Sequence, residues 1–188
     1  MVRRHKTDES GATLVEFALI LPVLALLVFG VIEFGYNFNN YISVRQGVRE
    51  GARQGVVANF GTTTSCSLTT GSAASANTPT KELLCTTKDR IGISSPAPTE
   101  LRTKVVFDPT TCSGGAGFCG TYTSGNGLIV CAIYPAKSFT GLISPFLANT
   151  MLKSKVEMRI EQTPSSSSPQ LQAVQEDPPS GANWNFCS

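Results

Sequence analysis

The stretch that decides the fold is Ala12–Ile32, ATLVEFALILPVLALLVFGVI. From Phe17 onward, sixteen consecutive residues carry neither a charged nor a polar side chain. At about 1.5 Å of rise per residue, a helix of these 21 residues is roughly 31 Å long, which matches the hydrocarbon core of a bilayer. Pro22 lies inside the run, and transmembrane helices tolerate proline because neighbouring groups satisfy the freed backbone. The stretch therefore predicts a single membrane-spanning helix.

The basic residues on the two sides of this stretch predict its orientation. Arg3, Arg4 and Lys6 precede it, and no Lys or Arg occurs from residue 33 to residue 44. Because basic residues favour the cytoplasmic side, the N-terminus is predicted to be cytoplasmic. The protein would be a single-pass protein of the inner, cytoplasmic membrane, with its C-terminal domain periplasmic or extracellular.

A cleavable signal peptide is an alternative interpretation of the same stretch. The apolar cores of signal peptides are about 7 to 15 residues long and end in an A-x-A-like site. Here the apolar run is longer and continues into EFGYNFNNY. The sequence therefore favours a helix that is retained.

Glu16 is the one charged residue within the apolar stretch. An ionisable side chain in a membrane helix is costly and suggests a function that depends on a partner. Positions 12, 13, 19 and 20 are Ala, Thr, Leu and Ile, so the helix supplies no Lys or Arg at the spacing that a pair requires. The partner must come from elsewhere, unless Glu16 only extends toward the lipid headgroups.

The N-terminal third of the chain resembles a known family. A short basic leader, MVRRHKTDES, ends at Gly11, and a glutamate follows five residues later inside an apolar helix, as in type IV prepilins. The segments SGATLVEFALILPVLALLVFGVIEFGYNFNNY and VREGARQGVV, within residues 9–57, are similar to TadE-like proteins, the minor pseudopilins of tight-adherence (type IVc) pili.

The resemblance implies roles for four residues. Gly11 would be the last leader residue and Ala12 the N-terminus of a mature chain of 188 minus 11, or 177, residues after cleavage by a prepilin peptidase. Glu16 would pair with the α-amine of a neighbouring subunit during assembly. Phe17 stands where many major pilins have Tyr, and the chain is far longer than those subunits, so a minor component is expected.

The implied partners are the prepilin peptidase, other pilin or pseudopilin subunits and the pilus assembly platform, with a possible location in the pilus itself. The alternative is an extracytoplasmic binding or adhesion module that the helix anchors permanently, without incorporation into a pilus.

Charge and residue inventory argue against several other functions. A net charge of +2 is too small for a nucleic-acid binder. The only histidine, His5, lies in the leader, which removes Ser-His and Cys-His catalysis and the commonest metal ligand from the rest of the chain. Asp108, Glu157 and Glu161 leave carboxylate chemistry open. We expect a protein that is not an enzyme and that has no cofactor and no catalytic, cofactor-binding or metal site.

Beyond the membrane, the sequence predicts an α+β fold in which the long helix continues into a small pilin-like head with an antiparallel sheet. An apolar stripe with helical spacing extends the first helix, and a second helix begins at Pro79 with Thr78 as its N-cap. The stripe consists of Tyr41, Val44, Val48, Ala52 and Val56, the second helix covers 79–91, and the strands include 104–107, 127–135 and 153–162. Gly47, Gly51 and Gly55 recur every four residues and predict either a close helix contact or a helix that tertiary packing alone maintains.

Six cysteines lie on the predicted extracytoplasmic side, which indicates three disulfides. Six cysteines allow 15 pairings, of which we favour Cys66–Cys85, Cys112–Cys119 and Cys131–Cys187. Zinc binding is disfavoured because the chain contains no C-x-x-C motif and no histidine outside the leader.

The expected organisation has four parts. They are a leader (1–11), a transmembrane and emergent helix (12–58), a head (59–162) and a Ser/Pro-rich tail (163–188) that a cysteine ties back to the head.

Overall fold

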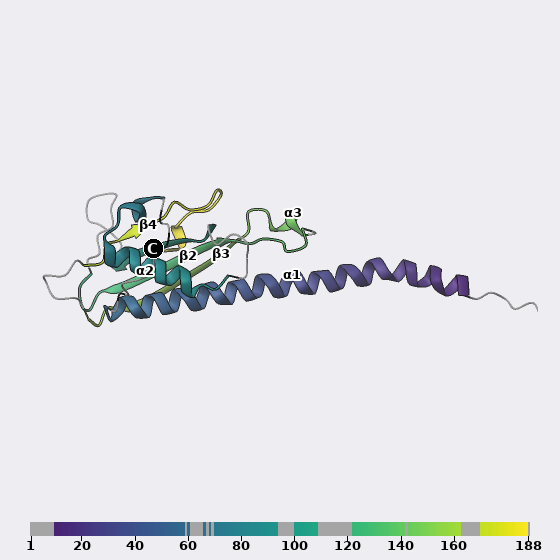
Figure 1. Ribbon diagram of the computed structural model, residues 1–188, viewed down its shortest axis with the longest axis horizontal. Helices are drawn as coiled ribbons and strands as arrows, with labels where there is room; N and C mark the ends of the chain where they lie inside the picture. The colour runs from purple at the N-terminus through teal and green to yellow at the C-terminus, as the bar shows by residue number, and fades with distance from the viewer. Residues whose placement is uncertain are drawn as a thin grey trace, which may run out of the picture.

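A long helix projects from a small mixed head (Figure 1). The structure, a computed structural model, describes residues 10–58, 60, 66, 68, 70–93, 100–108, 122–141, 143–162 and 170–187. The elements are α1 (Ser10–Val56), η1 (Ser72–Ser75), α2 (Thr78–Arg90), β1 (Arg102–Asp108), β2 (Gly127–Pro135), α3 (Ser144–Leu147), β3 (Met151–Arg159), β4 (Val174–Gln175) and η3 (Asn185–Cys187). The predicted α+β class is confirmed.

The head is built on a four-stranded sheet in the order β3-β2-β1-β4, in which every neighbouring pair is antiparallel. β1 and β2 pair over their full overlap, from Arg102 opposite Ile133 to Asp108 opposite Gly127. The three predicted strands are present, although β3 ends at Arg159 and not at residue 162. The fourth strand, β4, has only two residues, which is too short for the alternation of apolar and polar residues that identifies a strand in a sequence.

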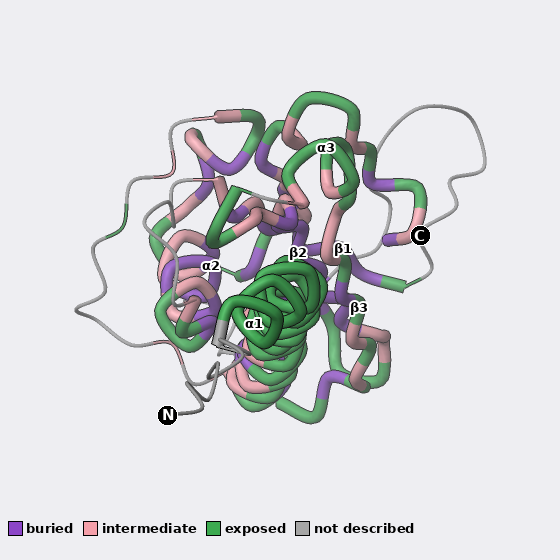
Figure 2. Tube along the Cα trace, turned by 90° about the vertical axis from the view of Figure 1, so that its right-hand side faces the viewer, coloured by how far each residue is buried: buried purple, intermediate pink, exposed green. Residues whose placement is uncertain are grey.

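The C-terminal half of α1 packs on one face of this sheet beside α2. Val44, Val48, Ala52 and Val56 of the predicted apolar stripe are buried there. Figure 2, which looks along α1, shows this helix against α2 and the sheet while its near half stands free and exposed. Tyr41 was expected in the same buried stripe, but its side chain is 38% exposed. At this level the contact face passes instead through Asn40, which is fully buried.

The regularly spaced glycines of α1 allow α2 to approach closely. A Cβ added at Gly47 would lie 2.7 Å from the backbone N of Ile91, and one at Gly51 would collide with the side chain of Thr87. A Cβ at Gly55 would collide with the side chain of Leu128 on β2 and would lie 3.3 Å from that of Leu83 on α2. Gly47 and Gly51 therefore serve a close contact between α1 and α2, and Gly55 lies where α1 meets both α2 and the sheet.

Helix α2 begins one residue earlier than expected. The N-cap is Asn77, whose side-chain oxygen accepts a hydrogen bond from the Thr80 N–H at 3.2 Å. Thr78 was predicted as the cap and is instead the first helical residue. Asn and Thr both cap helices well, and Asn77 is additionally held by its side-chain bond to the Gln170 carbonyl at 2.6 Å, which the local sequence does not reveal.

The C-terminal segment covers the opposite face of the sheet. Trp184 and Cys187 form a second apolar cluster there with buried residues of β1 and β2, namely Val106, Ile129, Cys131 and Ile133. The Trp184 indole donates to the Glu176 carbonyl at 2.9 Å. The sheet is therefore covered by helices on one face and by the C-terminal segment on the other.

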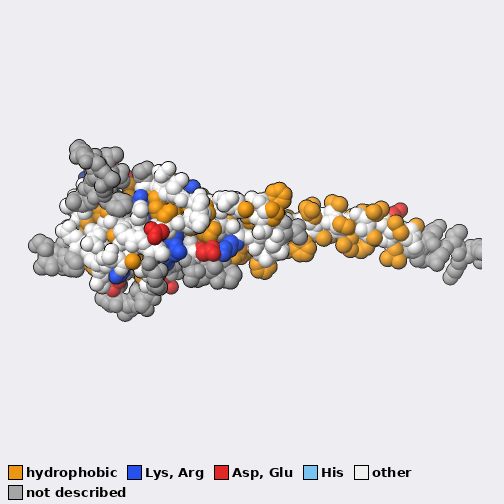
Figure 3. Space-filling view, turned by 90° about the horizontal axis from the view of Figure 1, so that it is seen from above, with side chains coloured by type: hydrophobic (Ala, Val, Ile, Leu, Met, Phe, Trp, Pro, Cys, Tyr) orange, Lys and Arg blue, Asp and Glu red, His pale blue; other side chains and the backbone are white. Residues whose placement is uncertain are grey.

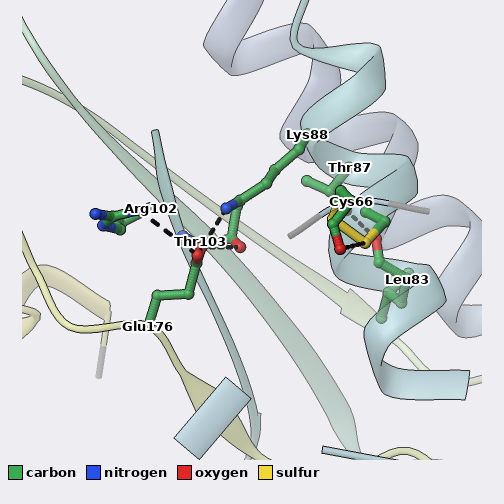
Figure 4. The surroundings of a disulfide bond; sticks show 8 residues. Cys66, Leu83, Thr87, Lys88, Arg102, Thr103 and Glu176 are labelled. Atoms are coloured by element: carbon green, nitrogen blue, oxygen red, sulfur yellow. Dashed lines mark hydrogen bonds and ion pairs between the residues drawn. A yellow bond between two sulfur atoms is a disulfide. The ribbon is translucent and has the colours of Figure 1, made fainter. Parts of the chain in front are cut away.

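A buried carboxylate fixes the start of that C-terminal segment. Glu176 is fully buried and accepts from the Lys88 ammonium at 2.6 Å, the Thr103 N–H at 2.7 Å and the Thr103 hydroxyl at 2.8 Å. Arg102 lies 3.9 Å away as a second cationic neighbour (Figure 4). Because the charge is paired and hydrogen-bonded, its burial is tolerated, and it joins α2, β1 and the C-terminal segment.

Tyr122 joins the end of α1 to the segment before β2. Its hydroxyl is buried and donates to the Gly55 carbonyl at 2.6 Å. Its ring packs against that of Phe107, with the two ring centroids 5.8 Å apart. Burial raises the pKa of Tyr122 to about 12, because the charged phenolate is disfavoured away from water.

Candidate functional site

The N-terminal half of α1 is a bare apolar helix. Every residue of 11–32 is exposed except the partly buried Ala25. In the space-filling view, hydrophobic side chains cover the part of the molecule that extends beyond the head (Figure 3). Within the described part of the chain, α1 is the one helix long and apolar enough to cross a membrane, and none of its most apolar window is buried in the protein. A buried core helix of a soluble protein is therefore not the explanation for its composition.

The predicted processing and assembly residues lie in the first two turns of α1. Gly11 and Ala12 are exposed and helical, and a Cβ added at Gly11 would meet nothing within 4 Å. Glu16 and Phe17 are exposed as well. Ala12 and Glu16 are four residues apart, which places them on one face of the helix about 6 Å apart along its axis. The structure brings these four positions together at the end of α1 that lies farthest from the head (Figure 1).

A second carboxylate, Glu33, follows the apolar stretch directly, and the sequence analysis assigned it no role. Its side chain is fully buried and accepts four hydrogen bonds from residues more than 100 positions away in the sequence. The donors are the Ser138 hydroxyl at 2.6 Å, the Phe139 N–H at 2.9 Å, the Thr140 N–H at 2.6 Å and the Thr140 hydroxyl at 2.5 Å. We call this arrangement the Glu33 clasp.

The donors belong to the connection between β2 and β3, which we call the β2–β3 arm and define by its described residues, 136–141 and 143–150. The arm includes α3 and extends from the head alongside α1 toward the bare half of the helix (Figure 1). Asn37, one turn after Glu33, donates to the Lys137 carbonyl at 3.3 Å. The ring of Tyr36 packs on that of Phe139 with centroids 5.7 Å apart.

The chemistry of the clasp is that of a fixed anchor. An ionised carboxylate bound by several donors is strongly held, because hydrogen bonds to a charged acceptor are roughly twice as strong as those between neutral groups. Two of the donors are backbone N–H groups, so the clasp fixes the path of the arm as well as its side chains. Glu33 thus holds the arm at the level where α1 leaves the head and its bare half begins.

Glu33 could have been found by the reasoning that identified Glu16. Positions 29, 30, 36 and 37 are Phe, Gly, Tyr and Asn, so Glu33 also lacks a basic partner at helical spacing. What the sequence cannot supply is the partner, because Ser138, Phe139 and Thr140 reach Glu33 only through the fold.

Two disulfides are present among the described residues, and both are pairings that the sequence analysis favoured. Cys66 bonds to Cys85 on α2, with Cα atoms 5.4 Å apart (Figure 4). Cys131 of β2 bonds to Cys187, with Cα atoms 6.1 Å apart, and this bond ties the C-terminal segment to the sheet. The third expected pairing, Cys112–Cys119, lies outside the described residues, as do residues 1–9 of the expected leader.

Comparison with known proteins found a match for the N-terminal segment of the chain. Residues 11–53 match a family model described as TadE-like protein. The match covers the bare half of α1 and most of the half that packs on the head, and over this segment it confirms the resemblance identified from the sequence. No curated protein and no solved structure matched the chain.

Proposed function

We propose, from the TadE-like match over residues 11–53, that this chain is a component associated with tight-adherence pili and, more specifically, a minor pseudopilin. The observation that carries the proposal is a continuous helix whose first half is bare and apolar and whose second half is built into a head. Such a helix can lie in the membrane before assembly and pack among other subunits' helices afterwards. In both places its head stays outside the membrane.

In this proposal the N-terminus is cytoplasmic and a prepilin peptidase cleaves between Gly11 and Ala12. The protein is then a substrate of that enzyme and has no catalytic activity of its own. The exposure of both residues at the free end of α1 supports access by a peptidase. The basic residues before the helix support the orientation.

Glu16 is proposed to set the position of the subunit during assembly. Its carboxylate stands alone on the bare helix, and an unpaired charge in a low-dielectric medium strongly favours a cationic partner. The α-amine that cleavage creates at Ala12 of a neighbouring subunit has the required charge. Pairing across subunits would fix their axial stagger, since Ala12 and Glu16 are about 6 Å apart along the helix.

The mass of the mature N-terminus tests the processing step. In cells with an active prepilin peptidase, we expect the chain to begin at Ala12, and a Gly11→Val variant should retain its leader because a branched side chain replaces the small residue at the cleavage site. An intact leader in the wild-type chain would refute processing and would favour the permanently anchored module instead.

Co-purification with pilus subunits tests the assembly step. Glu16→Gln keeps the shape of the side chain and removes its charge, so we expect normal membrane insertion and reduced co-purification. Glu50→Gln is the matched control, because Glu50 lies on the same helix but outside its bare half, where its contact to Arg53 is a 3.9 Å pair at the surface. Equal co-purification of both variants would mean that Glu16 only extends toward the headgroups.

A further inference from the structure

The β2–β3 arm carries two aromatic side chains that stay largely exposed, although the ring of Phe139 also packs on that of Tyr36. Phe139 is 70% exposed and Phe146, on α3, is 83% exposed. Isolated exposed apolar residues are common on soluble proteins. These two are distinguished by their position, because the Glu33 clasp holds the arm beside the helix at a fixed level.

That level is set by the length of the apolar stretch. Residues 12–32 span roughly 31 Å as a helix, which equals the hydrocarbon core, so Glu33 falls where the core ends and the headgroup layer begins. The bonds from Ser138, Phe139 and Thr140 to Glu33 therefore bring the arm to the same layer. Trp and Tyr are enriched in the headgroup layer, and Phe is among the apolar residues that interfacial segments bury at the boundary between headgroups and acyl chains.

The charge pattern around this level fits a lipid surface. From Ser138 to Thr150 the arm sequence, SFTGLISPFLANT, has no charged residue, and α1 has none between Glu33 and Arg45. The basic residue at the base of the arm, Lys137, is bound to Glu100 at 2.8 Å. Within residues 33–44 of α1 and 138–150 of the arm, the single carboxylate is that of Glu33, which is buried in the clasp and is not presented to lipid.

We propose that the β2–β3 arm is a second membrane contact, which inserts Phe139 and Phe146 into the outer-leaflet interface beside α1. The proposal rests on the membrane-anchoring part of the proposed function and on neither processing nor pilus assembly. Two separate points of contact, the helix and the arm, would fix both the tilt of α1 and the face that the head turns to the membrane.

Quenching of tryptophan fluorescence by brominated lipids tests the proposal. The full chain is reconstituted in phosphatidylethanolamine–phosphatidylglycerol vesicles whose acyl chains are brominated either near the headgroup or near the chain end. The chain contains one tryptophan, the buried Trp184, which gives a constant background. Phe146→Trp adds a probe on the arm. We expect a blue-shifted emission and a loss of intensity that is several-fold larger with the shallow bromines than with the deep ones.

Two matched variants separate the possible failures. Leu24→Trp, at the middle of the apolar stretch, should be quenched most by the deep bromines, and Val57→Trp, directly after the far end of α1, should not be quenched. If Leu24→Trp is not quenched, the membrane anchor itself is refuted. If Leu24→Trp is quenched but Phe146→Trp behaves like Val57→Trp, the arm lies in water and the proposal fails. A blue shift of Phe146→Trp without quenching would overturn it in favour of a protein partner.

Discussion

Replacing Glu33 by glutamine should release the β2–β3 arm while leaving the rest of the head intact. In the best orientation, the amide oxygen of Gln keeps the three bonds to Ser138 and Thr140, because one carboxylate oxygen accepts all of them. The amide nitrogen then faces the Phe139 N–H, which bonds to the other carboxylate oxygen. One buried donor is left without an acceptor, and the remaining three bonds lose their charge.

The expected magnitude follows from these two losses. An unsatisfied buried donor costs about 1–3 kcal/mol, and a hydrogen bond to a neutral acceptor is worth about 1 kcal/mol less than one to a charged acceptor. Because such contributions are not additive, we expect a loss of about 3 kcal/mol in the closing free energy of the arm. At about 1.4 kcal/mol per factor of ten, the open fraction of the arm should rise about a hundredfold.

Amide hydrogen exchange measures this opening directly, since exchange from a native protein reports local free energies of opening. In the full chain, peptides covering residues 136–150 should exchange about a hundredfold faster in Glu33→Gln than in the wild type. Peptides from β1 and from α2 should not change. Glu50→Gln is the control, because a surface ion pair contributes about 0–1 kcal/mol and Glu50 does not touch the arm.

Two results would refute the reasoning. If the arm peptides exchange within about threefold of the wild-type rate, less than about 0.7 kcal/mol has been lost, and the clasp does not hold the arm. If all peptides of the head accelerate together, Glu33 supports the whole fold and not the arm.

Three further predictions concern the head. Gly47→Ala should lower the free energy of unfolding by about 1–3 kcal/mol in urea titrations, because the new Cβ meets the backbone of α2. Gly35→Ala is the control: a Cβ at Gly35 has open space, so this variant should be neutral or stabilising by up to about 1 kcal/mol. Burial raises the pKa of Tyr122 to about 12 from an ordinary value of about 10, so its contribution to stability is complete below pH 10 and decreases above it. Between pH 10 and 12 the free energy of unfolding of the wild type should therefore fall by up to about 1.4 kcal/mol per pH unit relative to Tyr122→Phe. Parallel plots of unfolding free energy against pH for the two proteins would contradict this. Replacing Cys131 and Cys187 by serine opens a loop of 56 residues and should cost about 4 kcal/mol on the chain-entropy model, measured by thermal unfolding against the oxidised wild type.

Much of the fold could be predicted because its signals are local. The apolar stretch, the spacing of Val44, Val48, Ala52 and Val56, and the β-branched runs of β1 and β2 each depend on a few consecutive turns or residues. These signals gave the long helix, its buried face and the central strands.

The prediction of the buried face of α1 failed where that face changes from apolar to polar residues. From Glu33 to Asn40 the fully buried side chains of α1 are polar, so the apolar pattern leads instead to the exposed Tyr41. Burying a charged group is costly unless it is paired or hydrogen-bonded, and the partners of Glu33 come from residues 138–140. The clasp therefore depends on tertiary contacts that no local pattern contains. The same is true of β4 and of the buried Glu176.

Because α1 is one continuous helix, the orientation of the head depends on the length of the apolar stretch. Each residue of an α-helix adds about 100° of rotation and about 1.5 Å of rise. Deleting one residue from the bare half would therefore turn the head about a quarter of a revolution with respect to whatever holds the N-terminal end. Inserting seven residues, which is close to two full turns, would restore the orientation of the head and move it about 10 Å farther from the N-terminal end of α1. The number of residues in this stretch, and not its hydrophobicity alone, therefore sets the direction in which the head faces.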